Sequence, residues 1–492
     1  MKIAVEGCCH GELDKIYGRL QELEKTNNDK IDLVLICGDF QAIRNPADLK
    51  TMSVPAKYAK LGNFYEYYSG QKKAPYLTLF VGGNHEASNH LWELYHGGWV
   101  CENIYYLGAA GVVNYKGLRI GGISGIYKHF DYYKGHFERY PYNYSDQRSI
   151  YHVRDYEVQK LLRIQKPIDI MISHDWPAGI ERCGNLDQLL RIKPFFKNDV
   201  DRHRLGNPAH TRLLKKLKPS RWFSAHLHVR YTANIDNAAE SKYLIKAKDD
   251  QTLNVTQFLA LDKCLPNRQF LEIIDVPDSS SNSNEGLMYD LEWLAVTRAM
   301  QPYLSLRPQA IPLPNDADLQ SAIDQELMYL DMMLDTDEID LTIPANFEMN
   351  VDTKSRFYTP SPNPQTAEFC KLLGIDDVIG NACPPPPPPA KSNAATPDKS
   401  ERVSSSTTSQ TVLEEEPSEH KDEANRAPAT NEKQPGDEQV LPPKQTATAA
   451  GDVDKDQAET NMASATTETQ SHDEQALPTQ EGNQSPKRQK LN

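Results

Sequence analysis

The sequence lacks several features that would place it in a membrane or outside the cell. No run of apolar residues approaches the roughly 20 that a membrane-spanning helix needs, so we expect no transmembrane segment. The opening MKIAVEGCCHGELD has neither the basic leader nor the apolar core of a signal peptide. Eight Cys in 492 residues are too few for a disulfide scaffold. The chain is therefore expected in a reducing compartment, the cytosol or the nucleus.

Apolar residues are also scarce, and positive charge is low overall. Hydrophobic content is 39% and Pro is high at 33, which predicts that part of the chain is not folded. The formal net charge of −14, taken whole, argues against a nucleic-acid binder. Divided by segment, however, the net charge is +9 over residues 1–234, −15 over 235–383 and −8 over 384–492. A polyanion-binding domain followed by acidic segments fits this partition.

The last two segments differ in their expected order. Residues 384–492 open with six prolines and continue in Ser, Thr, Ala, Gln and Glu, a composition that predicts a disordered tail. The basic cluster at 486–490, PKRQK, is either a nuclear localisation signal or a solvated charged end. Within 235–383, apolar spacings over 286–300 and 316–334 predict helices.

The first 234 residues read as an α/β domain. Apolar runs at 3–5 and 33–37 bracket an amphipathic stretch, which predicts a strand–helix–strand unit. Further strands are expected at 76–81, 117–123, 168–172 and 221–225.

Potential metal ligands follow five of these apolar runs. They are, in chain order, Cys8 and His10, Asp39, Asn84 with His85, His174, and His226 with His228. Open α/β sheets place their sites at the carboxyl ends of strands, and thiolate, imidazole, carboxylate and amide oxygen are ligands for divalent zinc, iron and manganese. Each residue alone has an ordinary structural explanation. Together they supply the roughly seven ligands, one of them a shared carboxylate, that two metal ions need.

The order of these motifs resembles the calcineurin-like metallophosphoesterases. Cys8-x-His10, Gly38-Asp39, the Gly83–Glu86 block, His174 and His226-x-His228 match the family's Asp-x-His, Gly-Asp, Gly-Asn-His-Glu/Asp, His and Gly-His-x-His blocks. Cys8 replaces the usual Asp, and the last block reads Ser-Ala-His-Leu-His.

These departures, the opening sequence and the SHDWP block at 173–177 resemble the RNA lariat debranching enzyme family, from residue 1 to roughly 370. The resemblance implies a metallophosphoesterase β-sandwich flanked by helices over 1–234. It also implies a smaller, mostly helical C-terminal domain over 235–383, and it leaves the disordered acidic tail, 384–492, uncovered.

The resemblance also implies roles for the ligand residues. Cys8, His10 and His228 would hold one divalent ion, and Asn84, His174 and His226 the other. We expect Asp39 to bridge them, with Fe2+, Zn2+ or Mn2+ as the metals. The Cys8 thiolate either ligates, which would favour zinc or iron over magnesium, or does not, which would leave one ion loosely held. His85 would be the general acid that protonates the leaving 2′-oxygen.

A segment at about 124–158 stands where this family carries a lariat recognition loop. It contains ten of the chain's 42 aromatics, interleaved with Lys and Arg. Aromatic faces stack unpaired bases and cations bind the backbone, so RNA contact is expected rather than simple packing on the domain. The expected RNA-binding residues are Tyr127, Lys128, Tyr132, Tyr133, Lys134, Arg139, Tyr144 and Arg148.

The activity implied is metal-dependent hydrolysis of the 2′-5′ phosphodiester bond in excised intron lariats. Branched RNA is then the partner, with spliceosome-associated factors as further candidates, in a nuclear and monomeric protein. A protein phosphatase would normally show Gly-Asp-x-x-Asp-Arg-Gly, whereas residues 38–44 read GDFQAIR. A DNA nuclease would normally keep Asp at position 8, and a metal-free scaffold would tend to lose ligand residues.

Overall fold

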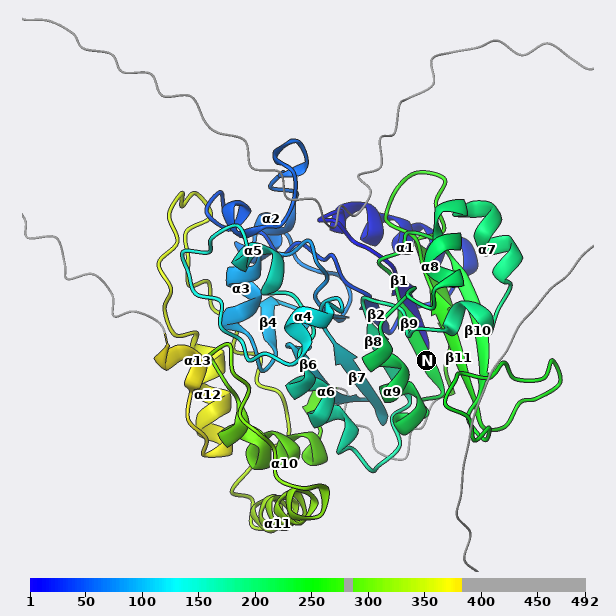
Figure 1. Ribbon diagram of the computed structural model, residues 1–492. Helices are drawn as coiled ribbons and strands as arrows, with labels where there is room; N and C mark the ends of the chain where they lie inside the picture. Colours follow the sequence, from blue (N-terminus) through cyan, green and yellow to red (C-terminus); the bar gives the residue numbers. More distant parts are fainter. Residues whose placement is uncertain (278–285, 383–492) are drawn as a thin grey trace, which may run out of the picture. The chain divides into compact units, whose positions relative to one another are not determined.

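A computed structural model describes residues 1–277 and 286–382 of the chain. These residues form two β-sheets packed face to face with helices on the outer faces, which confirms the expected α/β sandwich (Figure 1). The tail predicted from 384 onward, with its basic cluster at 486–490, lies outside the described residues.

The first sheet has six strands in the order β12-β1-β2-β3-β5-β4. β1, β2, β3 and β5 are parallel, and the edge strands β12 and β4 run antiparallel to their neighbours. The strands are β1 (Lys2–Glu6), β2 (Leu33–Ile36), β3 (Thr78–Phe80), β4 (Gly98–Cys101), β5 (Ile104–Tyr106) and β12 (Leu271–Asp275).

The second sheet has seven strands in the order β10-β11-β9-β8-β7-β6-β13. β11, β9, β8 and β7 are parallel at its centre. The strands are β6 (Ala110–Tyr115), β7 (Leu118–Ile123), β8 (Ile170–Ser173), β9 (Arg221–Ser224), β10 (Tyr231–Asp236), β11 (Val255–Ala260) and β13 (Leu287–Tyr289).

The alternation of side chains along the strands explains the layers. Ile3 and Val5 of β1 point into the core between the sheets, where they meet Ile172 and Phe223 of the second sheet. Ala4, between them in sequence, faces the opposite side and packs under α1. Strands buried on both faces read as continuous apolar runs, which is why they were recognisable in the sequence.

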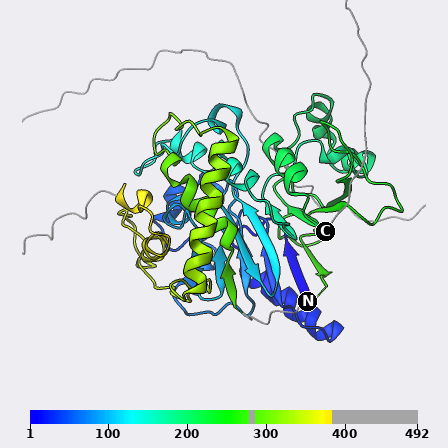
Figure 2. The ribbon, with the colours of Figure 1, turned by 90° about the horizontal axis from the view of Figure 1, so that it is seen from below.

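Helices cover both outer faces of the sandwich. The α-helices are α1 (Leu13–Asn27), α2 (Phe64–Tyr68), α3 (Ser88–Glu93), α4 (His129–Tyr132), α5 (Asp146–Ser149), α6 (Asp155–Leu162), α7 (Leu186–Ile192), α8 (Lys197–Asp201), α9 (Pro208–Leu217), α10 (Leu291–Met300), α11 (Asp316–Asp335), α12 (Pro364–Leu373) and α13 (Val378–Asn381). Short 3-10 helices are η1 (Asp48–Thr51), η2 (Ala56–Tyr58), η3 (Ile180–Arg182), η4 (Pro194–Phe196) and η5 (Gln301–Tyr303). α11 lies alongside α10, whose residues are all buried or half-buried (Figure 2). None of the helices in the described ranges is long and apolar enough to cross a membrane.

The region from 235 onward contributes strands as well as helices. The expected boundary at 234 falls inside β10, and β11, β12 and β13 are built into the two sheets. The helix predicted over 286–300 begins only at Leu291. Residues Leu287–Tyr289 pair instead with β6, and the Asp290 side chain accepts a hydrogen bond from the Trp293 amide and so caps α10.

Candidate metal centre

The five ligand blocks meet at one edge of the sandwich. Each follows the carboxyl end of a parallel strand, namely β1, β2 and β3 of the first sheet and β8 and β9 of the second. Because the two sheets face each other, their strand ends bring together residues separated by more than 200 positions in sequence.

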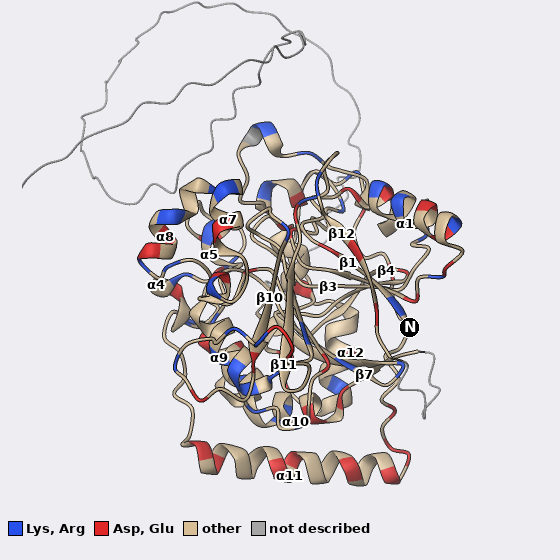
Figure 3. Ribbon diagram, turned by 90° about the vertical axis from the view of Figure 1, so that its right-hand side faces the viewer, with Lys and Arg blue, Asp and Glu red and all other residues tan. Residues whose placement is uncertain are grey.

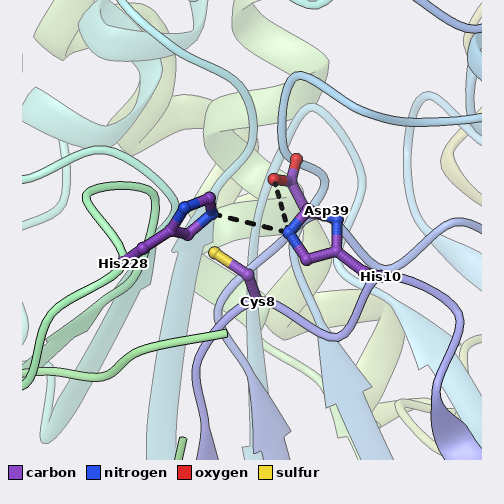
Figure 4. A group of neighbouring side chains, drawn as sticks. All are labelled: Cys8, His10, Asp39 and His228. Atoms are coloured by element: carbon purple, nitrogen blue, oxygen red, sulfur yellow. Dashed lines mark hydrogen bonds and ion pairs between the residues drawn. The ribbon is translucent and has the colours of Figure 1, made fainter. Parts of the chain in front are cut away.

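Four side chains form a compact cluster at this edge. One ligand atom from each of Cys8, His10, Asp39 and His228 lies within 4.8 Å of the others (Figure 4). His10 Nε2 is 3.5 Å from His228 Nε2 and 3.7 Å from Asp39 Oδ2. A thiol, two imidazoles and a carboxylate converging on one point are a donor set for a divalent transition metal.

Asp39 connects this cluster to a second group of donors. Its Oδ2 faces His10, and its Oδ1 lies 3.3 Å from His174 Nε2. Asn84 Oδ1 is also 3.3 Å from His174 Nε2, and the His226 ring lies 4.9 Å from the His174 ring, centroid to centroid. The two oxygens of one buried carboxylate thus point to two sets of donors, as the bridging role requires.

The backbone at the ligands is held in a conformation that side chains rarely adopt. φ is +48° at His10, +45° at Asp39, +61° at His226 and +50° at His228. Non-glycine residues in the left-handed region cost free energy and persist only where the surroundings impose them, typically at functional sites. The surrounding structure therefore imposes the backbone conformation at these four candidate ligands.

Two glycines permit the close approach of the blocks. A Cβ on Gly83 would come 2.2 Å from Asp39 Oδ1, and a Cβ on Gly38 would come 2.3 Å from His174 Nδ1. Only glycine fits at either position, because any side chain would displace a ligand.

Burial and neighbouring charges shift the pKa values of the candidate ligands. It lowers the pKa of His226 and of His228 to about 3, so both imidazoles are neutral at neutral pH, the form that binds metal. Burial opposes ionisation of Asp39, but His174, His85 and His10 hold its pKa well below the usual range. Burial and the nearby Asp39 carboxylate raise the pKa of the Cys8 thiol. A bound cation would reverse that effect.

Neighbouring groups orient the rings. His174 Nδ1 donates to the Cys37 carbonyl at 2.8 Å, which leaves Nε2 for a metal. Gln41 Nε2 lies 3.3 Å from His10 Nδ1. The Cys8 sulfur accepts from the His226 amide at 3.2 Å. The residues present therefore fit divalent metal ions in both donor chemistry and orientation.

His85 lies beside the cluster with one ring nitrogen engaged. Its Nδ1 donates to the Ser53 carbonyl at 3.1 Å, and its ring centroid is 6.0 Å from that of His10. The His85 amide donates to Asp39 Oδ1 at 2.9 Å. Nε2 is the nitrogen left to exchange a proton.

Two residues near the centre were not among the predicted site residues. Glu86 is buried and accepts hydrogen bonds of 2.8 Å from the amides of Phe40, Gln41 and Gly83, so it holds the turns that carry Asp39 and Asn84. Lys263 follows β11 and adds positive charge that helps to lower the pKa of His10 and His228. The rule used for the other strand ends would have found it, because Asp262, Lys263 and Cys264 directly follow an apolar run.

The expected RNA-binding residues do not form one uniform surface. Tyr133 and Tyr144 are 64% and 75% exposed, whereas Tyr132 is buried and its hydroxyl donates to Asp155. Tyr127 is half-buried against the Tyr132 ring, and Lys128 is exposed.

The remaining cations of the loop already have partners. Lys134 pairs with Asp131 at 2.9 Å, Arg139 donates to the main-chain carbonyls of His136, Glu138 and Leu306, and Arg148 donates to the Tyr144 hydroxyl.

Comparison with known proteins places the chain in a family. Residues 1–230 match the calcineurin-like phosphoesterase family, and residues 253–378 match the lariat debranching enzyme C-terminal domain. Lariat debranching enzyme A of Xenopus laevis is 51% identical over 387 residues, covering 77% of this chain and 71% of the relative. The Homo sapiens lariat debranching enzyme is 50% identical, covering 77% and 70%. The Arabidopsis thaliana lariat debranching enzyme is 45% identical, covering 76% and 86%. With this identity and coverage, and with both domains matched, the chain belongs to the lariat debranching enzyme family.

Proposed function

We propose that this chain hydrolyses the 2′-5′ phosphodiester bond at the branch point of excised intron lariats and thereby linearises them. The observation that carries the proposal is the convergence of the ligand blocks around Asp39, in a chain whose relatives are lariat debranching enzymes. A calcineurin-like phosphoesterase domain supports phosphodiester hydrolysis with divalent metal ions.

The donor groups suggest two ions that share Asp39. Cys8, His10 and His228 would hold one, and the second donor group, Asn84, His174 and His226, would hold the other. When bound, two such ions supply an activated water and neutralise charge on the phosphate. A thiolate among the donors favours zinc or iron over magnesium at the first position, with manganese as a further candidate.

His85 is the residue that we assign to the leaving group. Cleavage leaves a 2′-oxygen that must gain a proton, and general-acid transfer is worth typically 10²–10⁴-fold in rate. The Ser53 carbonyl accepts from His85 Nδ1, which leaves Nε2 to carry the proton that is donated.

The aromatic loop is proposed to bind the nucleotides around the branch. Tyr133 and Tyr144 offer exposed ring faces on which unpaired bases can stack, at about 1–3 kcal/mol per base. Lys128 is exposed in the same loop and offers a positive charge for the RNA backbone. Because intron lariats arise from splicing, we also propose a nuclear location, with the basic cluster at 486–490 as a candidate signal.

A branched RNA of defined sequence tests the function directly. We expect hydrolysis of the 2′-5′ linkage, leaving a 2′-hydroxyl and a 5′-phosphate, and no comparable cleavage of a linear RNA of the same sequence. Equal cleavage of 3′-5′ linkages would contradict the proposal.

The role of His85 is tested by His85→Ala. We expect a fall in single-turnover rate of 10²-fold or more, with metal content and RNA affinity close to those of the unchanged protein. Turnover by the His85 variant at the normal rate would refute its role as the acid.

A further inference from the structure

The positive charge of the catalytic half is concentrated in one stretch. Residues 182–230 contain twelve Lys and Arg against three Asp, a net of +9, whereas residues 1–181 contain twenty-one of each sign. The aromatic loop, residues 124–158, contains five cationic and five acidic side chains. That loop can stack bases but contributes no net attraction for phosphates, which dominate nucleic-acid affinity.

Much of this charge stands on a small helical insertion between β8 and β9. The chain leaves β8 at Ser173, passes through the ligand His174, forms α7, η4 and α8, and returns through α9 to β9. Because β8 ends at the metal centre, the insertion emerges at the same edge of the sandwich. Figure 3 shows Lys and Arg segments on α7 and α8.

The insertion has an apolar inner side and a cationic outer side. Leu189, Phe196, Val200 and Leu205 are buried in the core on the outer face of the second sheet. On the outer side, we define the α7–α8 surface as Arg191, Lys193, Phe195, Lys197, Arg202 and Arg204.

Four of the five cations of this surface, Arg191, Lys197, Arg202 and Arg204, are exposed, and Lys193 is half-buried. The side chains of Lys197 and Arg204 are 68% and 54% exposed, and their ion pairs with Asp201 and Asp199 are of the surface kind, worth at most about 1 kcal/mol. Arg191 and Arg202 make no ion pair with any residue in the described ranges.

An exposed aromatic ring stands among these cations. Phe195 is 57% exposed, and its ring lies edge-on to that of the buried Phe196, with centroids 4.7 Å apart. Lys193 Nζ is 5.8 Å from the Phe195 ring centroid. A flat apolar ring among cations is the combination that binds single-stranded nucleic acid without reading its sequence.

The insertion adjoins the aromatic loop. Arg212 of α9 donates to the hydroxyl of Tyr132 in α4 at 3.2 Å and lies 3.6 Å from Asp155. The helix through which the insertion returns to β9 therefore lies against the aromatic loop.

We propose that the α7–α8 surface is a second RNA contact site, which binds the sugar-phosphate backbone of an intron strand several nucleotides from the branch. The proposal rests on the proposed function. The loop and the metal centre would select the branch, while the α7–α8 surface would supply sequence-independent affinity for long lariats.

The experiment uses the full chain with Arg191, Lys197, Arg202 and Arg204 all changed to Gln. Two substrates share one branch, one with arms of one or two nucleotides and one with arms of about fifteen. For the long substrate we expect KM to rise tenfold or more at low salt, with kcat unchanged. The slope of log affinity against log salt should fall by up to about 3, since each lost phosphate contact on a single strand is worth about 0.7. The short substrate should be cleaved as by the unchanged protein.

The control variant removes the same charge elsewhere. Lys25, Lys30, Lys73 and Lys166 are exposed and precede β2, β3 and β8, so they lie toward the edge opposite the metal centre. Changing these four to Gln should leave both substrates unaffected, and both variants should keep the melting temperature.

The outcomes separate the two proposals. If the unchanged protein cleaves neither substrate, the proposed function fails. If the unchanged protein cleaves both substrates, the function stands. The second contact site is then refuted if the α7–α8 variant cleaves both substrates normally, or if its KM rises equally for the short and the long substrate.

Discussion

Cys8 is the residue at which this site departs from the family pattern of the calcineurin-like phosphoesterases. Its sulfur is fully buried and lies within the four-residue cluster with His10, Asp39 and His228. Burial and the carboxylates of Asp39 and Glu6 raise the pKa of its thiol, so the thiolate forms only with help from a cation. Metal binding at this position should therefore release a proton and strengthen as pH rises.

Cys8→Asp tests whether the thiol is a ligand. A carboxylate is a harder donor, so we expect the preference for zinc over manganese to fall tenfold or more in competitive metal binding. A further buried carboxylate beside Asp39 should also lower the melting temperature of the metal-free protein, and added metal should restore it.

Cys9→Ala is the matched control, because Cys9 is equally buried but packs in the core beneath α1. An unchanged metal preference in Cys8→Asp would show that the thiol does not ligate.

Among the elements, α6 carries an unusual buried cation. Lys160 is 4% exposed, and its Nζ lies 4.3 Å from the centroid of the Trp293 ring of α10. Burial lowers the pKa of Lys160 to about 8, although Glu157 opposes the shift. Between about pH 8 and 10.5 the unfolded chain binds a proton that the folded chain does not. The contribution of Lys160 to the free energy of unfolding should therefore rise with pH across that window and be constant below it.

Lys160→Met removes this titration. The difference between the pKa of 10.5 in the unfolded chain and about 8 in the folded chain means that burying the Lys160 charge destabilises the fold by about 3 kcal/mol at neutral pH. The contact with Trp293 partly offsets this cost. We expect denaturant unfolding to show the variant more stable near pH 7.5, with the difference closing toward pH 10. Tyrosines ionise at high pH in both proteins alike, so their effect cancels in the difference between the two free energies of unfolding. Lys166→Met, at an exposed position beyond the same helix, should show no such convergence. A constant difference at every pH would contradict the buried-charge argument.

Among the strands and helices, some could be predicted from the sequence and others could not. β1, β2 and β8 were predictable because strands buried on both faces are short apolar runs, and the polar residues after them lie in the candidate metal centre. β13 was not, because Leu287–Tyr289 continues into the apolar pattern of α10 and pairs with β6, more than 170 residues earlier. The spacing of apolar residues reflects only neighbouring positions, so it cannot reveal a strand partner that is distant in the sequence. The buried state of Tyr132 was hidden for the same reason, since its contact with Arg212 is long-range.

For the molecule as a whole, charge is distributed unevenly over a common core. Residues 182–230 are basic, whereas α11 carries Asp and Glu with no Lys or Arg (Figure 3). The net charge of −14 combines these regions and conceals both. An acidic surface away from the metal centre repels polyanions such as RNA, which would limit nonspecific contact on that side.

The two regions that match separate families are interlaced in the fold, so we expect them to unfold as one unit. β11 lies between β9 and β10 in the second sheet, and β12 pairs with β1 in the first. Leu259, Leu261 and Ile274 from these strands fill the core between the sheets. A chain ending at 252 would lose both strands, expose the edges of β1 and β9 and leave that core incomplete.

We therefore predict that residues 1–252 alone fail to fold, with no fixed near-ultraviolet circular dichroism and no cooperative melting. Residues 1–382, which retain every described element, should melt in one transition at the temperature of the full chain. The measurement is calorimetry of both truncations beside the full chain. A cooperative transition in 1–252, or two transitions in 1–382, would show instead that the metal-binding half folds without the strands that follow it.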